Sequence, residues 1–311
     1  MRASLAGSII GNALLVLGRA MLIGGWRYRR QRFSRRVAGQ YAAMLALAGI
    51  AMAIPALLAT VGESTRPGAA VVRGSQLHQL SVGVAMILLV CYAAYIAYSV
   101  FGVRASHEDM LPISAATSGD EAGVPQDSAP ITVLEGEAAT KRRSLPAGPF
   151  VTLAAWWRTT LWLPIAVLAG ATVVTAVVSE VLVSTIEPLT HQIGLNPFFV
   201  GLIILPIVGN AAEHFSAITS ATRNHMEISM AITAGSSIQI ALLAAPILVL
   251  AGPLIGVPLD LNFTLLEVAM FALVTGLYAL ISLDGESTWL EGLLLCAFYL
   301  ILAVGTFFPP A

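Results

Sequence analysis

Residues 205–214 read LPIVGNAAEH and lie within an apolar stretch that extends over residues 197–222. A helix of that length can cross the hydrocarbon core of a bilayer, which is roughly 30 Å thick. A carboxylate at such depth costs about 2.5 to 3.5 kcal/mol, so Glu213 indicates a functional site. Because Pro206 lacks a backbone N–H and Gly209 relaxes the chain, we expect carbonyl groups of the preceding turn to face a cavity. The stretch therefore predicts a membrane-spanning helix with a polar site inside it.

The composition of the whole chain agrees with this interpretation. Of its 311 residues, 57% are hydrophobic and only 11% are charged, whereas soluble domains carry about 25% charged residues. Eight stretches, the one around Glu213 included, are long and apolar enough to cross a membrane. We therefore predict an all-α fold, a polytopic transmembrane helix bundle of about eight spans. The stretches are residues 3–24, 38–61, 77–101, 159–183, 197–222, 226–250, 263–283 and 288–308.

Basic residues predict the orientation of these spans. Six arginines lie between residues 27 and 36, in the short loop after the first stretch. Cytoplasmic loops carry an excess of Lys and Arg, so this loop is placed inside, and alternation then places both termini outside. Residues 103–158 are rich in Ser, Gly, Pro, Asp and Glu, which predicts an acidic, flexible cytoplasmic linker. We expect an integral protein of the bacterial inner membrane.

The chain contains a weak internal repeat. Residues 7–15 (GSIIGNALL) and 235–243 (GSSIQIALL) agree at six of nine positions, at an offset of 228. The copies lie on spans of opposite predicted direction, which is the pattern of inverted repeats in secondary transporters. The counterpart of Glu213 would precede Met1, so we expect an incomplete first repeat. The expected parts are a partial first repeat of about three spans (1–102), the linker (103–158) and a complete second repeat of about five spans (159–311).

Two residues in the central stretch form a candidate metal site. Asn210 and Glu213 lie three residues apart and share a helix face. Amide and carboxylate oxygens suit a hard cation, which takes about six to eight oxygen ligands. Glu213 could instead pair with Arg223 or His225 at the helix end. His214 could be a proton-coupled neighbour or a buried histidine bonded to a carbonyl, and both interpretations stay open.

Further oxygen donors lie on the repeated segment. Ser236, Ser237 and Gln239 follow on the sixth stretch, and Ser8 and Asn12 occupy the related place on the first. Close helix packing explains the serines better than ion binding does. The bulkier Gln239 and Asn12 are therefore the better candidates for ligands. Glu187, near the outer end of the fourth stretch, could line the path of an ion or could be a plain interfacial carboxylate.

Two motifs together resemble the second signature repeat of calcium/proton antiporters, a branch of the calcium/cation antiporter superfamily. They are GNAAEH at residues 209–214 and GSSIQI at residues 235–240. Residues 181–187 and 284–292 resemble further stretches of this family, and residues 3–12 resemble the end of its first signature repeat. The resemblance therefore covers nearly the whole chain apart from the linker.

The resemblance implies an exchanger that moves calcium, as its transported substrate, against protons. It implies eleven spans, with one acidic residue from each repeat facing the other near the midplane. Glu213 would be the ligand of the second repeat, with Asn210, Gln239 and Asn12 around it and Glu187 as a helper. The resemblance implies neither an enzyme nor a cofactor.

The chain departs from the family pattern, because the Gly-Asn-x-x-Glu element of the first repeat has no counterpart in it. We therefore interpret it as an N-terminally truncated form, either through a misplaced start or as a gene remnant. A single carboxylate leaves a divalent ion with uncompensated charge in a medium of low dielectric constant. The 311-residue chain alone is thus expected to bind calcium poorly.

Two other functions stay open. The chain could be a non-transporting fragment that associates with another membrane protein, or an intramembrane metal-dependent enzyme that uses Glu213 and His214. Hydrolytic zinc chemistry needs about three protein ligands, and no His-Glu-x-x-His motif occurs in the chain. The enzyme is therefore the less favoured of the two. Calcium ions, protons and the lipid bilayer are the expected partners, self-association into a homo-oligomer is left open, and no nucleic-acid motif is present.

Overall fold

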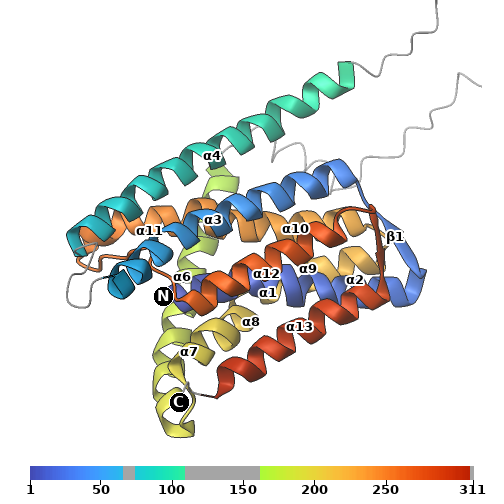
Figure 1. The fold of residues 1–311 in the computed structure, drawn as a ribbon. Coiled ribbons are helices and arrows are strands. Elements are labelled where there is room, and N and C mark those ends of the chain that lie inside the picture. The colour runs from blue at the N-terminus through green and yellow to red at the C-terminus, as the bar shows by residue number, and fades with distance from the viewer. Residues whose placement is uncertain (66–73, 109–161, 309–311) are drawn as a thin grey trace, which may run out of the picture. The chain divides into compact units, whose positions relative to one another are not determined.

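The computed structural model describes residues 1–65, 74–108 and 162–308 (Figure 1). The chain divides into two compact units. One comprises Met1–Asp109 and Gln192–Ala311, and the other comprises Met110–His191. Within the second unit, the described residues form most of one long helix, α6 (Trp162–Ile193). All other elements named below belong to the first unit.

Helices dominate the described residues, which confirms the predicted all-α class. Two strands of three residues each form a short antiparallel ribbon. In chain order the elements are α1 (Arg2–Gly11), η1 (Asn12–Val16), α2 (Leu17–Tyr28), β1 (Arg30–Arg32), α3 (Arg35–Thr65), α4 (Gly74–Glu108), α6, α7 (Pro197–Phe199), η2 (Val200–Ile204), α8 (Leu205–Gly209), α9 (Ala211–Thr222), α10 (Met226–Gln239), η3 (Ile240–Ala244), α11 (Ala245–Ala251), η4 (Gly252–Ile255), α12 (Leu265–Ile281), β2 (Glu286–Thr288) and α13 (Trp289–Phe307).

The described residues contain six helices that are long and apolar enough to cross a membrane, and seven if one bent pair counts as a span. A polytopic membrane bundle is therefore confirmed, whereas the predicted number of eight is not. The difference lies in α12, which has only 17 residues. The helix begins at Leu265 because the Thr264 side chain accepts a hydrogen bond from the Glu267 N–H and the Glu267 side chain accepts one from the Thr264 N–H.

Three π-helical segments interrupt the long helices. η2 and η3 are each followed by a short helix with proline as its second residue, Pro206 and Pro246. Proline cannot donate to the carbonyl four residues before it, so the helical ladder is interrupted at these places. η1 and η3 begin at residues 12 and 240, which are 228 apart. The two copies of the repeat therefore share an irregular backbone as well as a sequence pattern.

The helices around the two copies pack in matching pairs. In chain order, α1 to α4 correspond to α10 to α13. α2 packs against α13 as α11 packs against α4, and α1 contacts α12 as α10 contacts α3. The Ser237 hydroxyl donates over 3.3 Å to the carbonyl of Ile9, its own counterpart in the repeat. Equivalent residues meet in this way only near a two-fold axis between the copies.

The predicted domain boundaries at residues 102 and 158 stay predictions.

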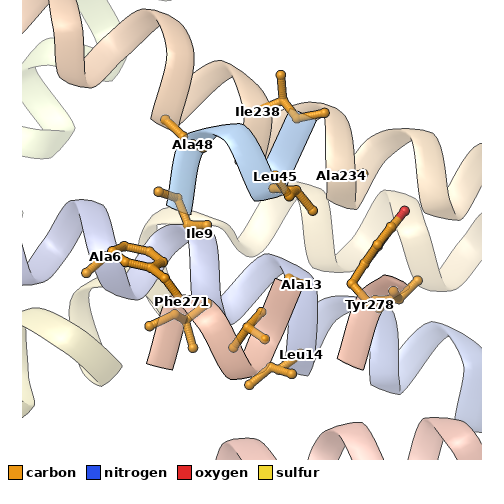
Figure 2. Packing of buried hydrophobic residues seen from close by; sticks show 14 of the residues in the cluster. Ala6, Ile9, Ala13, Leu14, Leu45, Ala48, Ala234, Ile238, Phe271 and Tyr278 are labelled. Atoms are coloured by element: carbon orange, nitrogen blue, oxygen red, sulfur yellow. The ribbon is translucent and has the colours of Figure 1, made fainter. Parts of the chain in front are cut away.

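The centre of the first unit is a cluster of buried apolar side chains (Figure 2). The side chains labelled in Figure 2 come from α1, η1, α3, α10 and α12, and others of the cluster come from neighbouring helices such as α2, α9 and α13. Small residues such as Ala6, Ala13 and Ala234 lie among larger ones such as Ile238 and Tyr278, and all five are at most 1% exposed. Small side chains let helices approach closely, which is how packing stabilises bundles in membranes. The cluster therefore holds the two copies of the repeat together.

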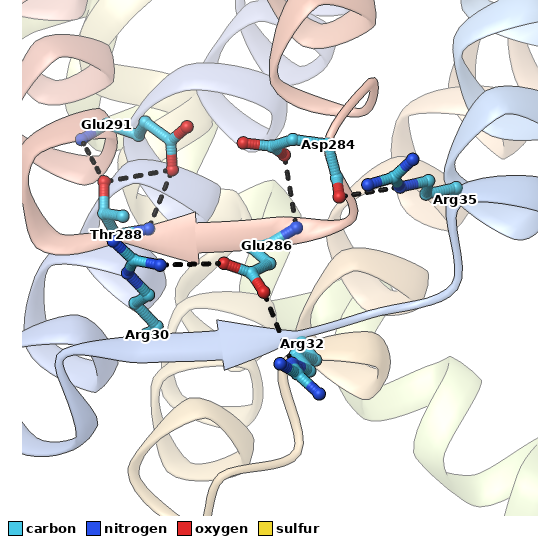
Figure 3. A network of polar contacts seen from close by, with 7 residues as sticks. All are labelled: Arg30, Arg32, Arg35, Asp284, Glu286, Thr288 and Glu291. Atoms are coloured by element: carbon cyan, nitrogen blue, oxygen red, sulfur yellow. Dashed lines mark hydrogen bonds and ion pairs between the residues drawn. The ribbon is translucent and has the colours of Figure 1, made fainter.

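Loops that are predicted to lie in the cytoplasm contact one another. β1, in the arginine-rich first loop, pairs with β2, in the loop before the last helix. Arg30 and Arg32 approach the Glu286 carboxylate at 3.6 and 3.3 Å, and Arg35 Nε donates to the Asp284 carbonyl at 2.7 Å (Figure 3). The two loops are thus joined by backbone pairing and by charge.

Loops that are predicted to lie outside meet in the same way. His78 Nδ1 lies 2.8 Å from Asp260 Oδ1, and Arg2 Nη1 donates to the Asn262 carbonyl at 2.6 Å. These contacts join the start of α4 and the N-terminal end of α1 to the segment before α12. In both cases the loops in contact are ones that the predicted alternation of spans places on the same side of the membrane.

Candidate cation site

The fifth predicted span is broken at Asn210. The helices on either side of this residue meet at 56°, and Asn210 itself has φ −96° and ψ 20°. Backbone bonds continue across the bend, because Asn210 donates to the Pro206 carbonyl at 2.9 Å and His214 donates to the Asn210 carbonyl at 3.0 Å. The bend places the start of α9, with Glu213 in its first turn, inside the span rather than at its end.

Helix α1, which carries the first copy of the repeat, packs against this break. Asn210 Nδ2 donates over 3.5 Å to the carbonyl of Ser8. A Cβ atom on Gly7 would lie 2.6 Å from Pro206 Cγ and would collide with the carbonyl oxygen of Leu202. Leu202 is the residue whose helical donor Pro206 removes. Its carbonyl therefore packs against Gly7, and the expectation that it faces a cavity is wrong.

The Glu213 side chain is half-buried and unpaired within the described residues. It forms no hydrogen bond or ion pair with any described residue, Arg223 and His225 included. Its place in the first turn of α9 is favourable for a negative charge, because unpaired N–H groups give a helix a positive N-terminal end. An acidic side chain therefore suits this position, and Glu213 has no cationic partner among the described residues.

Asn12 is a predicted ligand whose buried side-chain atoms lack hydrogen-bond partners among the described residues. Its side chain is fully buried, and neither its Oδ1 nor its Nδ2 has a hydrogen-bond partner among the described residues. Leaving one such group unpaired in a protein interior costs about 1 to 3 kcal/mol. Asn12 lies at the start of η1, which contacts α9 and α10. Its Oδ1 atom is therefore not engaged by any described residue.

The three predicted donors of the second copy differ in their surroundings. Ser236 is half-buried and Gln239 is exposed, and neither side chain has a hydrogen-bond partner among the described residues. Their neighbour Ser237 is fully buried, and its hydroxyl contacts the carbonyls of Ile9 at 3.3 Å and Thr233 at 3.0 Å. Ser237 therefore forms a hydrogen bond to α1, while the roles of Ser236 and Gln239 as ligands stay predictions.

A basic residue that the sequence analysis did not single out lies beside His214. Arg19 Nη1 is 3.2 Å from His214 Nδ1, and the histidine is 8% exposed. Because a guanidinium only donates hydrogen bonds, Nδ1 is the acceptor and a neutral ring carries its proton on Nε2. The ring thus bonds to a side chain, and no bond to a carbonyl is found among the described residues. Arg19 lies inside the first predicted span, where a charged side chain is costly. That cost could have identified Arg19 from the sequence alone.

The remaining predicted residue is Glu187. It belongs to α6, and its side chain lies outside the described residues, so its role as a helper stays a prediction. Within the described residues, no three side chains of His, Cys, Asp or Glu gather into a metal-binding cluster.

These features together define a class of protein. A helix broken inside its span carries a carboxylate at the N-terminal end of its second half. The first copy of the repeat packs against the break and also contacts the second copy. Secondary transporters have this design, with the ion site at the interface of inverted repeats. The profile of the sodium/calcium exchanger protein family matches residues 1–101 and 163–308, and the chain belongs to this family.

Similar proteins carry the expected description. A Ca²⁺/H⁺ antiporter of Aphanothece halophytica is 37% identical over 314 residues, which covers 100% of this chain and 74% of the relative. The Ca²⁺/H⁺ antiporter ChaA of Bacillus subtilis is 33% identical and covers 98% and 74%. The solved structure of native YfkE has a TM-score of 0.68 and 32% identity, and covers 98% of this chain and 74% of that one.

The comparisons confirm two predictions. The resemblance to calcium/proton antiporters is confirmed by relatives that carry this description along the length of the chain. The prediction that the chain is a transporter and not an enzyme is confirmed by the family to which it belongs. As a member of this family with several apolar helices, the chain is an integral membrane protein.

Proposed function

We propose that this chain exchanges calcium for protons across a membrane, and that Glu213 binds either one. The observation that carries the proposal is the unpartnered Glu213 carboxylate at a helix break against which α1 packs. The description of the relatives as calcium/proton antiporters supports the choice of the two ions.

Competition at one carboxylate explains how the two fluxes are coupled. A protonated Glu213 is neutral and offers calcium no charge, so binding of one ion requires release of the other. Carrying a neutral site through the closed state costs less than carrying a bare anion through the bilayer core. Asn210 and Asn12 would add amide oxygens to the ion's shell, and Ser8 and Ser236 would add hydroxyls at its edge.

The test is calcium uptake into vesicles that contain the purified chain. We expect an imposed pH gradient to drive uptake and a protonophore to abolish it, while a sodium gradient of the same size drives none. The sodium arm is needed because the family includes exchangers named for sodium. Uptake that follows the sodium gradient and ignores the pH gradient would contradict the proposal.

We further propose that the 311 residues by themselves exchange calcium slowly, because the site is short of negative charge. The elements that meet at the break, α1, η1, α8 and α9, contain one acidic residue between them, Glu213. A doubly charged ion beside one carboxylate keeps a net positive charge in a poorly solvated place.

Replacing Asn12 with aspartate tests this proposal within the chain. The change exchanges an unpartnered amide for a second carboxylate of almost the same shape. We expect calcium affinity to rise by at least about tenfold, since paired opposite charges are far more favourable than a single one in such a site. Asn262→Asp, in the loop before α12, adds the same charge elsewhere and should leave the affinity unchanged. An unchanged affinity in Asn12→Asp would show that charge is not limiting.

Arg19 is expected to weaken cation binding, because its positive charge lies next to His214 and hence one residue from Glu213. At an effective dielectric constant of about 20, a unit charge roughly 10 Å from a divalent ion repels it by about 3 kcal/mol before screening. Arg19→Gln should therefore raise the apparent calcium affinity by on the order of tenfold. Arg223→Gln, at the exposed end of α9, is the matched control. Equal effects of the two changes would refute a local role for Arg19.

We also propose a location and a division for the chain. We place the protein in the inner (plasma) membrane of a bacterium, because matching relatives come from bacteria such as Bacillus subtilis. We further propose domain boundaries at residues 102 and 158, a role for Glu187 near the ion path, and association into a homo-oligomer. Crosslinking in native membranes would test the last of these.

A further inference from the structure

We propose that a small cavity at the arginine-rich end of α2 and α13 binds the phosphate headgroup of an anionic phospholipid. The cavity has a volume of about 360 Å³ and is lined by Gly25, Trp26, Arg29 and Trp289. It lies where two apolar helices, Arg2–Tyr28 and Trp289–Phe307, reach the same end of the bundle. Its position is therefore at the level of the lipid headgroups.

The walls of the cavity suit a membrane surface. Trp26 is 82% exposed and Trp289 is 47% exposed. Indole rings are enriched at the headgroup level because they are apolar bodies with one polar N–H group. Gly25 lets the helices approach, since a Cβ there would lie 2.8 Å from the Trp289 Cα. The two indoles thus flank a gap that is fixed by direct contact between α2 and α13.

Arg29 supplies the charge inside the cavity. It ends α2 with φ 61° and ψ −52°, which is a conformation that side chains rarely adopt. Backbone outliers of this kind occur at ligand clamps more often than elsewhere. The Arg29 side chain forms no hydrogen bond or ion pair with a described residue. A planar guanidinium without a partner is a good donor for a phosphate group.

The nearby acidic side chains are already engaged. Glu286 pairs with Arg30 and Arg32, Asp284 accepts a hydrogen bond from the Glu286 N–H, and Glu291 caps the start of α13. No acidic side chain among the described residues pairs with Arg29. Among the described residues, Arg29 thus has no complementary charge, and a lipid phosphate is the anion that is abundant at this level of a membrane.

The test uses the purified 311-residue chain in detergent and measures bound lipid by native mass spectrometry. We expect phosphatidylglycerol to bind, and phosphatidylcholine with the same acyl chains to bind at least about fivefold more weakly. Arg29→Gln should lose about fivefold or more in phosphatidylglycerol affinity. Arg36→Gln removes the same charge outside the cavity, at a residue that donates to the Tyr98 hydroxyl, and should change the affinity less than twofold.

Two further arms keep the result interpretable. Arg29→Gly suits the positive φ at this position, so it should fold and lose lipid binding as Arg29→Gln does. Inorganic phosphate at the same concentration should not displace the lipid. Equal losses in the Arg29 and Arg36 variants would overturn the proposal in favour of diffuse attraction to the basic loop. Displacement by free phosphate would overturn it in favour of a soluble anion.

Discussion

Replacing Glu213 with glutamine is expected to reduce proton-driven calcium uptake by at least about 100-fold and to leave the fold intact. Glutamine keeps the size of the side chain and one oxygen, but it carries neither the charge nor the proton that the exchange needs. Removing one partner of a buried charge pair costs about 3 to 5 kcal/mol, which accounts for a loss of this size. Glu213 has no partner among the described residues, so the substitution breaks no contact in the fold.

Glu227→Gln is the matched control for this experiment. Glu227 is exposed in the first turn of α10, and its replacement by glutamine removes the same charge as Glu213→Gln does. We expect its uptake to stay within about twofold of the wild-type value, as is usual for an exposed charge. If Glu213→Gln transports calcium at the wild-type rate, another group binds the ion. If both variants fail equally, overall charge and not the site controls transport.

Replacing Gly7 with alanine is expected to destabilise the fold by roughly 1 to 3 kcal/mol and to impair transport as well. The added methyl group would collide with the Leu202 carbonyl and lie 2.6 Å from Pro206 Cγ. These atoms belong to the backbone and to a stiff ring, so they cannot move aside cheaply. Relief requires α1 to shift away from η2 and α8, which would displace Ser8 from Asn210. Thermal unfolding in detergent and calcium uptake measure the two effects.

The repeat itself provides the control for Gly7. Gly235 is the counterpart of Gly7 at the offset of 228, and a Cβ there meets nothing within 4 Å. Gly235→Ala should therefore leave both stability and transport unchanged, or slightly raise stability, because alanine favours a helix over glycine by about 1 kcal/mol. Equal destabilisation by the two substitutions would show that contact between α1 and the broken helix does not carry the effect.

The spans could be predicted because apolar stretches of about 20 residues have few alternatives to a membrane helix. Helix α12 is the exception, because it is predicted as a span but has only 17 residues. Its apolar stretch begins at residue 263, but the Thr264 and Glu267 side chains cap the helix from Leu265 and shorten it. Local capping sets where a helix starts, and average hydropathy does not report it.

The site could be predicted in part. The cost of a charge in an apolar span identifies Glu213 and would equally have identified Arg19, but only the structure shows that Arg19 reaches His214. The repeat aligns Ser8 with Ser236, whereas the residue in contact is Ser237, because the two-fold axis passes close to Ile9 and Ser237. Sequence spacing orders residues along one helix, and contacts between helices depend on how the faces are rotated and packed.

The proposed function requires that calcium and protons move in opposite directions through one site. The most direct measurement records calcium entry and internal pH together in vesicles that contain the purified chain, for the wild type and for Glu213→Gln. We predict that calcium entry is accompanied by a rise in internal pH over the same time course, because protons leave as calcium enters, and that both signals vanish in Glu213→Gln. Calcium entry in the wild type without any change in internal pH, or coupled fluxes that persist in Glu213→Gln, would contradict the account.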